Sequence, residues 1–215
     1  MTNAYFAPRQ QMPIVVLLLA GAIVAAFLLT GQYAPEQHQA IYNELAFVPA
    51  AYDASQPDHY TSVSQAALPL FGHVFVHAGF THIFMNMLAF FQASPFLARR
   101  LGGVRFLVLF FLSAIGGAGA YYLINPHDAN GMVGASGAVC GVFGAYFLAV
   151  RPTPREALAD PQVRTAMLTF LGINVVLMAL LRLPIAWQAH LGGFVSGALL
   201  YLVLAPRQRA AGPWG

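Results

Sequence analysis

The feature that most constrains this chain is its series of apolar stretches, which are separated by short polar segments. A bilayer core about 30 Å thick is crossed by about 20 apolar residues in an α-helix. Hydrophobic residues make up 59% of the chain and charged residues only 8%, against about 25% charged residues in soluble domains. The stretches also lack the alternating pattern of a membrane-spanning β-strand. We therefore predict an all-α bundle of six transmembrane helices, near residues 12–30, 80–97, 106–124, 136–150, 165–181 and 188–205.

The polar segments predict one membrane domain over residues 1–215, with a core at about 68–204. The first stretch is longer than the apolar region of a signal peptide, about 7–15 residues, so we expect a retained helix. The external connection at 31–70 mixes polar and apolar residues, which favours short helices on the membrane face. Glycines at three- or four-residue spacing predict close helix packing in the fourth and sixth helices: Gly134, Gly137, Gly141, Gly144, Gly193 and Gly197.

The placement of the arginines predicts how the helices are oriented. All ten basic residues are arginines, and only Arg182 falls outside the two termini and the second and fourth connections. The positive-inside rule then puts both termini in the cytoplasm. The absence of lysine and the abundance of alanine, glycine and arginine favour a bacterial inner (plasma) membrane, and we expect no nucleic-acid partner. Five acids lie on the external side: Glu36, Glu44, Asp53, Asp58 and Asp128.

Strongly polar side chains within a predicted span are costly in lipid, so each is a functional candidate. Three of them, His82, Ser136 and His190, precede the next cytoplasmic-side arginine by 17, 15 and 17 residues. At about 1.5 Å per residue all three lie about 22–26 Å above that boundary. Because their helices run in the same direction, the three can meet in a cavity open to the outside. The others are Asn174 and Asn86, which shares a helical face with His82.

Ser136 is the candidate nucleophile of this cavity. It follows a loop at the start of a short predicted helix, where free backbone N–H groups suit an oxyanion; an ordinary N-cap serine is the alternative. His190 is the candidate base, since a serine hydroxyl is a poor nucleophile at neutral pH; a histidine simply hydrogen-bonded to a neighbour is the alternative. No Asp or Glu lies in a predicted span, so a Ser–His dyad is favoured over a triad.

Three nearby histidines, His73, His77 and His82, suggest a zinc site as an alternative. No Asp or Glu lies between residues 58 and 128 to support it, and no His-Glu-x-x-His pattern is present, so we expect no metal and no cofactor. Cys140, one turn beyond Ser136, is the only cysteine. It can form no internal disulfide, and we expect a buried small residue there.

Three segments together resemble the rhomboid intramembrane proteases in residue type, order and helix placement, over about residues 68–204. They are His77-Ala-Gly-Phe-Thr-His82-Ile-Phe-Met-Asn86, Gly134-Ala-Ser136-Gly137 and Ala189-His190-Leu-Gly-Gly193-Phe-Val-Ser-Gly197. The resemblance implies a serine endopeptidase in which Ser136 attacks the scissile carbonyl and His190 accepts and returns the proton. It implies an oxyanion site formed by His82, Asn86 and the Ser136 backbone N–H.

The resemblance also implies that the partners are the lipid bilayer and single-span membrane proteins, which are cut near the outer surface. The fifth helix and the loop at 182–188 would form the substrate gate, and Asn174 would be a packing residue. The chain departs from the family pattern in three ways: the first loop lacks a Trp-Arg pair, Ala98 stands where many members have glutamate, and Cys140 replaces a larger residue. The catalytic residues are all present.

The alternatives to proteolysis are a pseudoprotease and a transporter. A rhomboid-like pseudoprotease would bind membrane helices without cutting them, but such proteins typically lack the serine or the histidine. A transporter would be expected to carry carboxylates in its spans and an inverted repeat, and the sequence has neither.

Overall fold

The computed structural model describes residues 11–29, 35–181 and 186–206. Within these ranges the chain is helical, with one isolated antiparallel bridge and no strand, so the all-α prediction is confirmed. The Asn174 side chain and residues 182–185, which include Arg182, lie outside the described residues. In chain order the helices are α1 (Ile14–Leu29), α2 (Pro35–Leu45), η1 (Pro49–Tyr52), α3 (Val63–Gly72), η2 (His73–Phe75), α4 (Phe80–Leu101), α5 (Gly103–Ile124), α6 (Ser136–Ala149), α7 (Pro154–Ala159), α8 (Pro161–Leu181) and α9 (Trp187–Leu204).

The six predicted stretches coincide with α1, α4, α5, α6, α8 and α9. By length and apolar composition, α5 and α9 can each cross a bilayer. The α3–η2 segment and α4, which meet at a bend of 81°, pass the same test together, while α1 and α6 are apolar but shorter. The described helices thus supply two or three candidate spans, and the number six stays a prediction.

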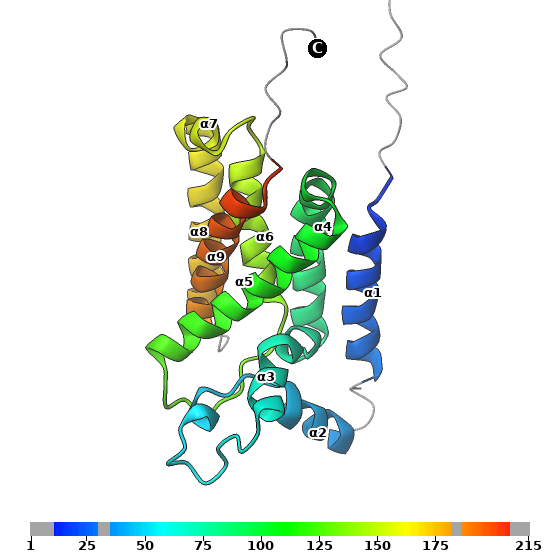
Figure 1. The fold of residues 1–215 in the computed structure, drawn as a ribbon, viewed down its shortest axis with the longest axis vertical. Coiled ribbons are helices and arrows are strands. Elements are labelled where there is room, and N and C mark those ends of the chain that lie inside the picture. Colours follow the sequence, from blue (N-terminus) through cyan, green and yellow to red (C-terminus); the bar gives the residue numbers. More distant parts are fainter. Residues whose placement is uncertain (1–10, 30–34, 182–185, 207–215) are drawn as a thin grey trace, which may run out of the picture.

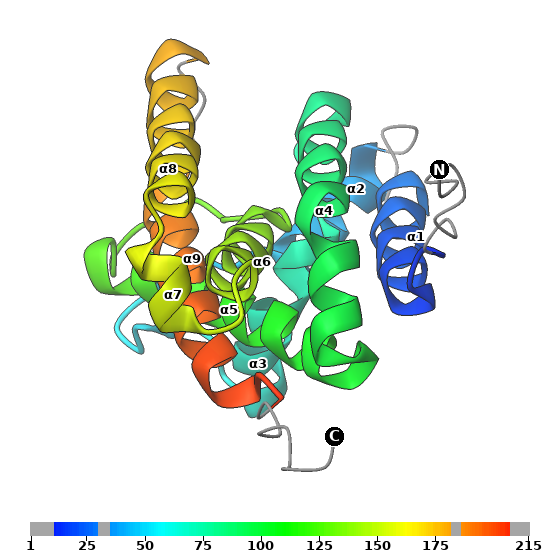
Figure 2. The same cartoon turned by 90° about the horizontal axis from the view of Figure 1, so that it is seen from above.

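Helix α6 is the most enclosed helix of the bundle. All of its residues from Gly137 to Ala149 are buried except Tyr146, and it packs against α9, α5 and α4. Seen from above, α6 lies between α9 and α4 (Figure 2). A Cβ atom added to Gly193 or Gly197 would overlap a carbonyl oxygen of α6. The predicted close packing of these two helices is therefore confirmed, and it brings their backbones into direct contact.

The connection after α1 forms short helices at one end of the bundle, as predicted, and the external side of this end stays a prediction. Figure 1 shows α2 and α3 at this end, and α7 with the start of α1 at the other. Helix α3 begins with a capping box, in which the Ser62 side chain accepts from the Gln65 backbone N–H and the Gln65 side chain accepts from the Ser62 backbone N–H. The sharp bend between η2 and α4 brings the end of η2 close to the first turn of α4. The candidate site lies at this turn.

Candidate active site

Ser136 is the first residue of α6, and the N-cap position before it is held by Ala135, which forms no side-chain cap. The alternative of an N-cap serine is therefore wrong, and the hydroxyl is available for another partner. Helix α6 has 14 residues and is about 21 Å long, which is less than the thickness of a bilayer core, about 30 Å. Such a short helix is compatible with a start below the membrane surface.

The Ser136 hydroxyl meets the His190 ring across the α6–α9 contact. Ser136 Oγ lies 2.8 Å from His190 Nε2, although the two residues are 54 apart in the chain. His190 is in the first turn of α9, and a Cβ on Gly137 would lie 3.3 Å from the carbonyl oxygen of Ala189. The close packing of the two helix starts thus brings the pair within hydrogen-bond distance, as the sequence predicted.

No carboxylate orients the His190 ring within the described chain. Its Nδ1 atom is buried and has no hydrogen-bond partner there. For Nε2 to accept the serine proton, the neutral ring must carry its own proton on Nδ1. Ser136 and His190 therefore form a hydrogen-bonded pair with no third, carboxylate member among the residues that the structure describes.

His82 faces the same site from α4. Its Nδ1 accepts a hydrogen bond from the Ala78 backbone N–H at 3.4 Å, which leaves the proton of the neutral ring on Nε2. A Cβ atom built on Gly134 would lie 2.7 Å from His82 Nε2. The Nε2–H group of His82 therefore lies against the backbone two residues before Ser136, where it can donate to an oxygen bound beside the serine.

Asn86 is buried one turn further along α4, at 5% exposure. Its amide nitrogen donates to the carbonyl oxygen of His82 at 3.0 Å. Among the described residues Asn86 forms no hydrogen bond with Ser136 or His190. One amide hydrogen remains available, so the predicted oxyanion role of Asn86 stays a prediction.

His73 and His77, which the sequence offered only as metal ligands, instead hold the backbone that leads to Ser136. The Gly134 N–H donates to the carbonyl oxygen of His73 at 2.8 Å, and the Ala135 N–H donates to His77 Nε2 at 3.4 Å. Both side chains are 1% exposed. Their contribution was missed because it depends on the turn between α3 and α4, which has no helical period.

A glycine is required at position 134 both by the backbone conformation and by the closeness of neighbouring atoms. Its φ of +113° lies in the region that side chains with a Cβ rarely adopt. A Cβ there would also approach the His82 ring to 2.6 Å. The first glycine of the Gly-Ala-Ser-Gly segment thus allows the chain to turn into α6 while it stays in contact with α4.

The loop before Ser136 is attached to the segment that carries α2 and η1. Phe47 and Met132 exchange backbone hydrogen bonds of 3.0 and 2.9 Å, and the Tyr42 hydroxyl donates to the Gly131 carbonyl oxygen at 2.8 Å. On the other side, the Tyr121 hydroxyl of α5 donates to the Asp128 carboxylate at 2.5 Å. These attachments join segments without a periodic pattern, so the sequence does not indicate them.

Two remaining features lie apart from this chemistry. Cys140 is buried at 5% exposure, as predicted.

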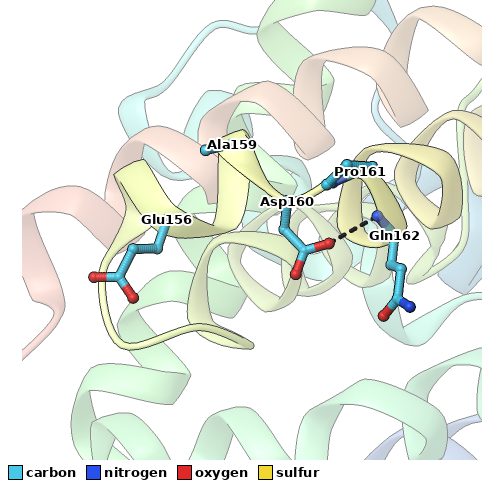
Figure 3. A pocket seen from close by; sticks show the side chains of 5 residues that line it. All are labelled: Glu156, Ala159, Asp160, Pro161 and Gln162. Carbon is cyan, nitrogen blue, oxygen red and sulfur yellow. Dashed lines mark hydrogen bonds between the residues drawn. The ribbon is translucent and has the colours of Figure 1, made fainter.

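A shallow hollow is found where α7 meets α8, at the far end of α6 from Ser136. Figure 3 shows its lining by Glu156, Ala159, Asp160, Pro161 and Gln162. The Gln162 backbone N–H donates to the Asp160 carboxylate there, so this carboxylate caps α8.

Comparison with known proteins adds independent information. A family model described as "Rhomboid domain" matches residues 64–207. The chain is 36% identical over 137 residues to "Putative rhomboid protease YdcA" of Bacillus subtilis, a match that covers 63% of this chain and 67% of that protein. It is 37% identical over 143 residues to "RHOMBOID-like protein 1" of Arabidopsis thaliana (64% and 34% covered). It is 34% identical over 185 residues to "Rhomboid protein 1, mitochondrial" of Saccharomyces cerevisiae (76% and 50% covered).

Proposed function

The chain belongs to the rhomboid family, and on this premise we propose that it is an intramembrane serine endopeptidase that cleaves single-span membrane proteins. Members of this family are embedded in membranes, and two relatives of this chain are named as a "putative rhomboid protease" and a "rhomboid protease". The observation that carries the proposal is the 2.8 Å distance between Ser136 Oγ and His190 Nε2.

In the proposed reaction, Ser136 Oγ attacks the carbonyl carbon of the scissile peptide bond while His190 Nε2 takes up the hydroxyl proton. The tetrahedral intermediate collapses when the carbon–nitrogen bond breaks, and His190 returns the proton to the leaving amine. A water molecule then hydrolyses the acyl ester, with His190 again as base and the Ser136 hydroxyl as leaving group. The proton transfers of both steps involve only Ser136 and His190, which meet at the α6–α9 contact.

The negative charge that forms on the carbonyl oxygen needs hydrogen-bond donors placed in advance. The proposed donors are the Ser136 backbone N–H, the Nε2–H of His82 and the amide of Asn86. The first lies in the first turn of α6 and has no hydrogen-bond partner among the residues that the structure describes, and the second lies against Gly134. Asn86 would need to direct its second amide hydrogen at the same oxygen.

We further propose a single domain of six spans, with both termini in the cytoplasm and the site open to the external side. The described arginines support this orientation, since they lie at the end of the bundle opposite α2 and α3 (Figure 1). A bacterial plasma membrane is the proposed location, on compositional grounds, although some relatives are named as mitochondrial.

The deciding experiment is incubation of the purified chain with a model single-span membrane protein. We expect cleavage by the wild type and by Cys140→Ala, a control one turn away on the same helix. Ser136→Ala and His190→Ala should each fall to near background, because members of a dyad act as a unit. A fluorophosphonate probe should label the wild type but not Ser136→Ala. Binding of the substrate without cleavage by the folded wild type would instead indicate a pseudoprotease.

A further inference from the structure

The arginines of the described chain gather at one end of the bundle. They lie in the last turn of α4, near the start of α5, after α6, in α7 and in the first turn of α8: Arg99, Arg100, Arg105, Arg151, Arg155 and Arg164. Figure 1 shows these segments together at the end opposite α2. The described acids at this end are Glu156 and Asp160, so the surface carries excess positive charge.

Some of these arginines are used to hold the bundle together. Arg151 is ion-paired with the Asp160 carboxylate, at 2.5 Å from Nη2. Arg100 donates to the Tyr201 hydroxyl at 3.2 Å and to the Pro152 carbonyl oxygen at 3.4 Å. These contacts join the ends of α4, α6 and α9, and both arginines are partly buried.

Arg99 and Arg105 are different. Both side chains are exposed, and neither forms a hydrogen bond or an ion pair with any residue that the structure describes. The same is true of Arg155 in α7, but Arg99 and Arg105 share one connection. They stand on either side of the short turn at Gly102, which joins α4 to α5. Two guanidinium groups are therefore directed away from the protein at one connection between helices.

Two exposed apolar side chains lie at or near this connection. Val104, next to Arg105, is 77% exposed, and Ile14 at the start of α1 is 73% exposed. The start of α1 lies beside the start of α5, since a Cβ on Gly103 would lie 3.5 Å from Val15 Cβ. Exposed apolar groups beside arginines at helix ends are expected where a membrane protein meets the headgroup region.

We propose that this surface, which we name the α4–α5 arginine site (Arg99, Arg105, Val104 and Ile14), binds an anionic phospholipid. The two guanidinium groups would bind the headgroup phosphate, for which their planar N–H donors are well matched. The acyl chains would cover Val104 and Ile14. A lipid satisfies both halves of the surface, whereas a free phosphate ion would leave the apolar half uncovered. The proposal does not depend on proteolysis.

The test is the thermal unfolding of the full chain, purified in neutral detergent, during titration with phosphatidylglycerol. A ligand that binds only the native state raises the unfolding temperature, and the concentration dependence gives an apparent Kd. An arginine that contacts the headgroup of a bound anionic lipid contributes about fivefold to its binding. We therefore expect Arg99→Gln/Arg105→Gln to raise the apparent Kd about thirtyfold, which is about fivefold for each arginine.

The matched control is Arg155→Gln/Arg164→Gln, which removes the same charge from the same end at α7 and α8. It should stay within about twofold of the wild type, because these arginines lie outside the proposed site. Equal weakening in both double variants would show diffuse charge attraction and overturn the proposal. So would an equal temperature shift with phosphatidylcholine or with inorganic phosphate. If the Arg99→Gln/Arg105→Gln chain does not fold, Arg105→Gln alone should weaken binding about fivefold, and an unchanged Kd would refute the site.

Discussion

His77 Nε2 accepts a hydrogen bond from the backbone N–H of Ala135, at 3.4 Å and across 58 residues of chain. Ala135 directly precedes Ser136, so this bond constrains the backbone that carries the proposed nucleophile. The His77 ring also lies 5.0 Å from that of His82, measured between ring centroids. His77 therefore contacts the backbone next to the proposed nucleophile and the ring of His82, a proposed oxyanion donor. We assign it a positioning role.

We expect His77→Leu to lower kcat about tenfold or more with little change in KM, because loss of a buried hydrogen-bond partner costs about 1–3 kcal/mol. His77→Gln keeps an acceptor and should recover much of the activity. The measurements are cleavage kinetics and the rate of fluorophosphonate labelling, with the unfolding temperature as a folding control. Wild-type kinetics in a folded His77→Leu chain would contradict the role.

His82 and Asn86 should show graded effects, because the Ser136 N–H remains in either single variant. Removal of one oxyanion donor in soluble serine proteases costs about 10²–10³ in kcat. Asn86→Ala should keep measurable activity, with kcat lowered more than KM is raised. His82→Ala should behave similarly or worse, and a fluorophosphonate should still label Ser136 in Asn86→Ala, but more slowly. If both variants are folded and cleave at the wild-type rate, α4 supplies only structure to the site.

The proposed orientation can be tested by chemical labelling of intact cells. In a Cys140→Ala background, Asp58→Cys or Asp128→Cys should react with an impermeant thiol reagent added outside, whereas Glu156→Cys should not. Permeabilised cells should label all three, which controls for reactivity. The reverse pattern would overturn the orientation and, with it, the estimate of depth for Ser136.

The Tyr121–Asp128 contact predicts an acid-sensitive contribution to stability. The hydrogen bond from the Tyr121 hydroxyl holds the pKa of Asp128 below its ordinary value. A carboxyl group whose pKa is lower in the folded chain stabilises it above the unfolded pKa, and loses this contribution as the pH falls through the folded pKa. We expect a loss of unfolding free energy on acidification below about pH 4.

Asp128→Asn should reduce this loss and lower stability near neutral pH by less than about 1 kcal/mol, because solvent screens a partly exposed carboxylate. Unfolding temperatures between about pH 3 and pH 7 would measure it, with Asp58→Asn as a control that leaves the Tyr121 bond in place. Identical pH profiles for wild type and Asp128→Asn would rule out this contribution.

Periodic features were the ones that the sequence predicted well. The glycine spacing in α6 and α9 indicated their close packing, and counting residues from the arginines placed Ser136 and His190 at one level. Both arguments use the regular rise of a helix, so they hold without knowledge of the loops. The predicted end of the second apolar stretch, at residue 97, was four residues short of Leu101. Arg99 and Arg100 continue α4, where basic side chains favour the helix end.

The irregular parts could not be predicted in this way. The bridge between Phe47 and Met132 and the hydrogen bond from Tyr42 to Gly131 join distant segments, and no repeating pattern marks either. The same is true of His77, whose partner is a backbone N–H presented by the turn into α6. The bond from the Asn86 amide to the His82 carbonyl depends on a side-chain rotamer, which helical spacing does not specify.

The position of His190 in the last described helix has a consequence for synthesis of the protein. Chains are made at about 5–20 residues per second from the amino terminus, and Ser136 precedes His190 by 54 residues. For several seconds the growing chain therefore contains the proposed nucleophile and oxyanion donors but not the proposed base. Under the proposed mechanism, a nascent chain cannot cleave its own helices or those of its neighbours until α9 has been made and has packed against α6.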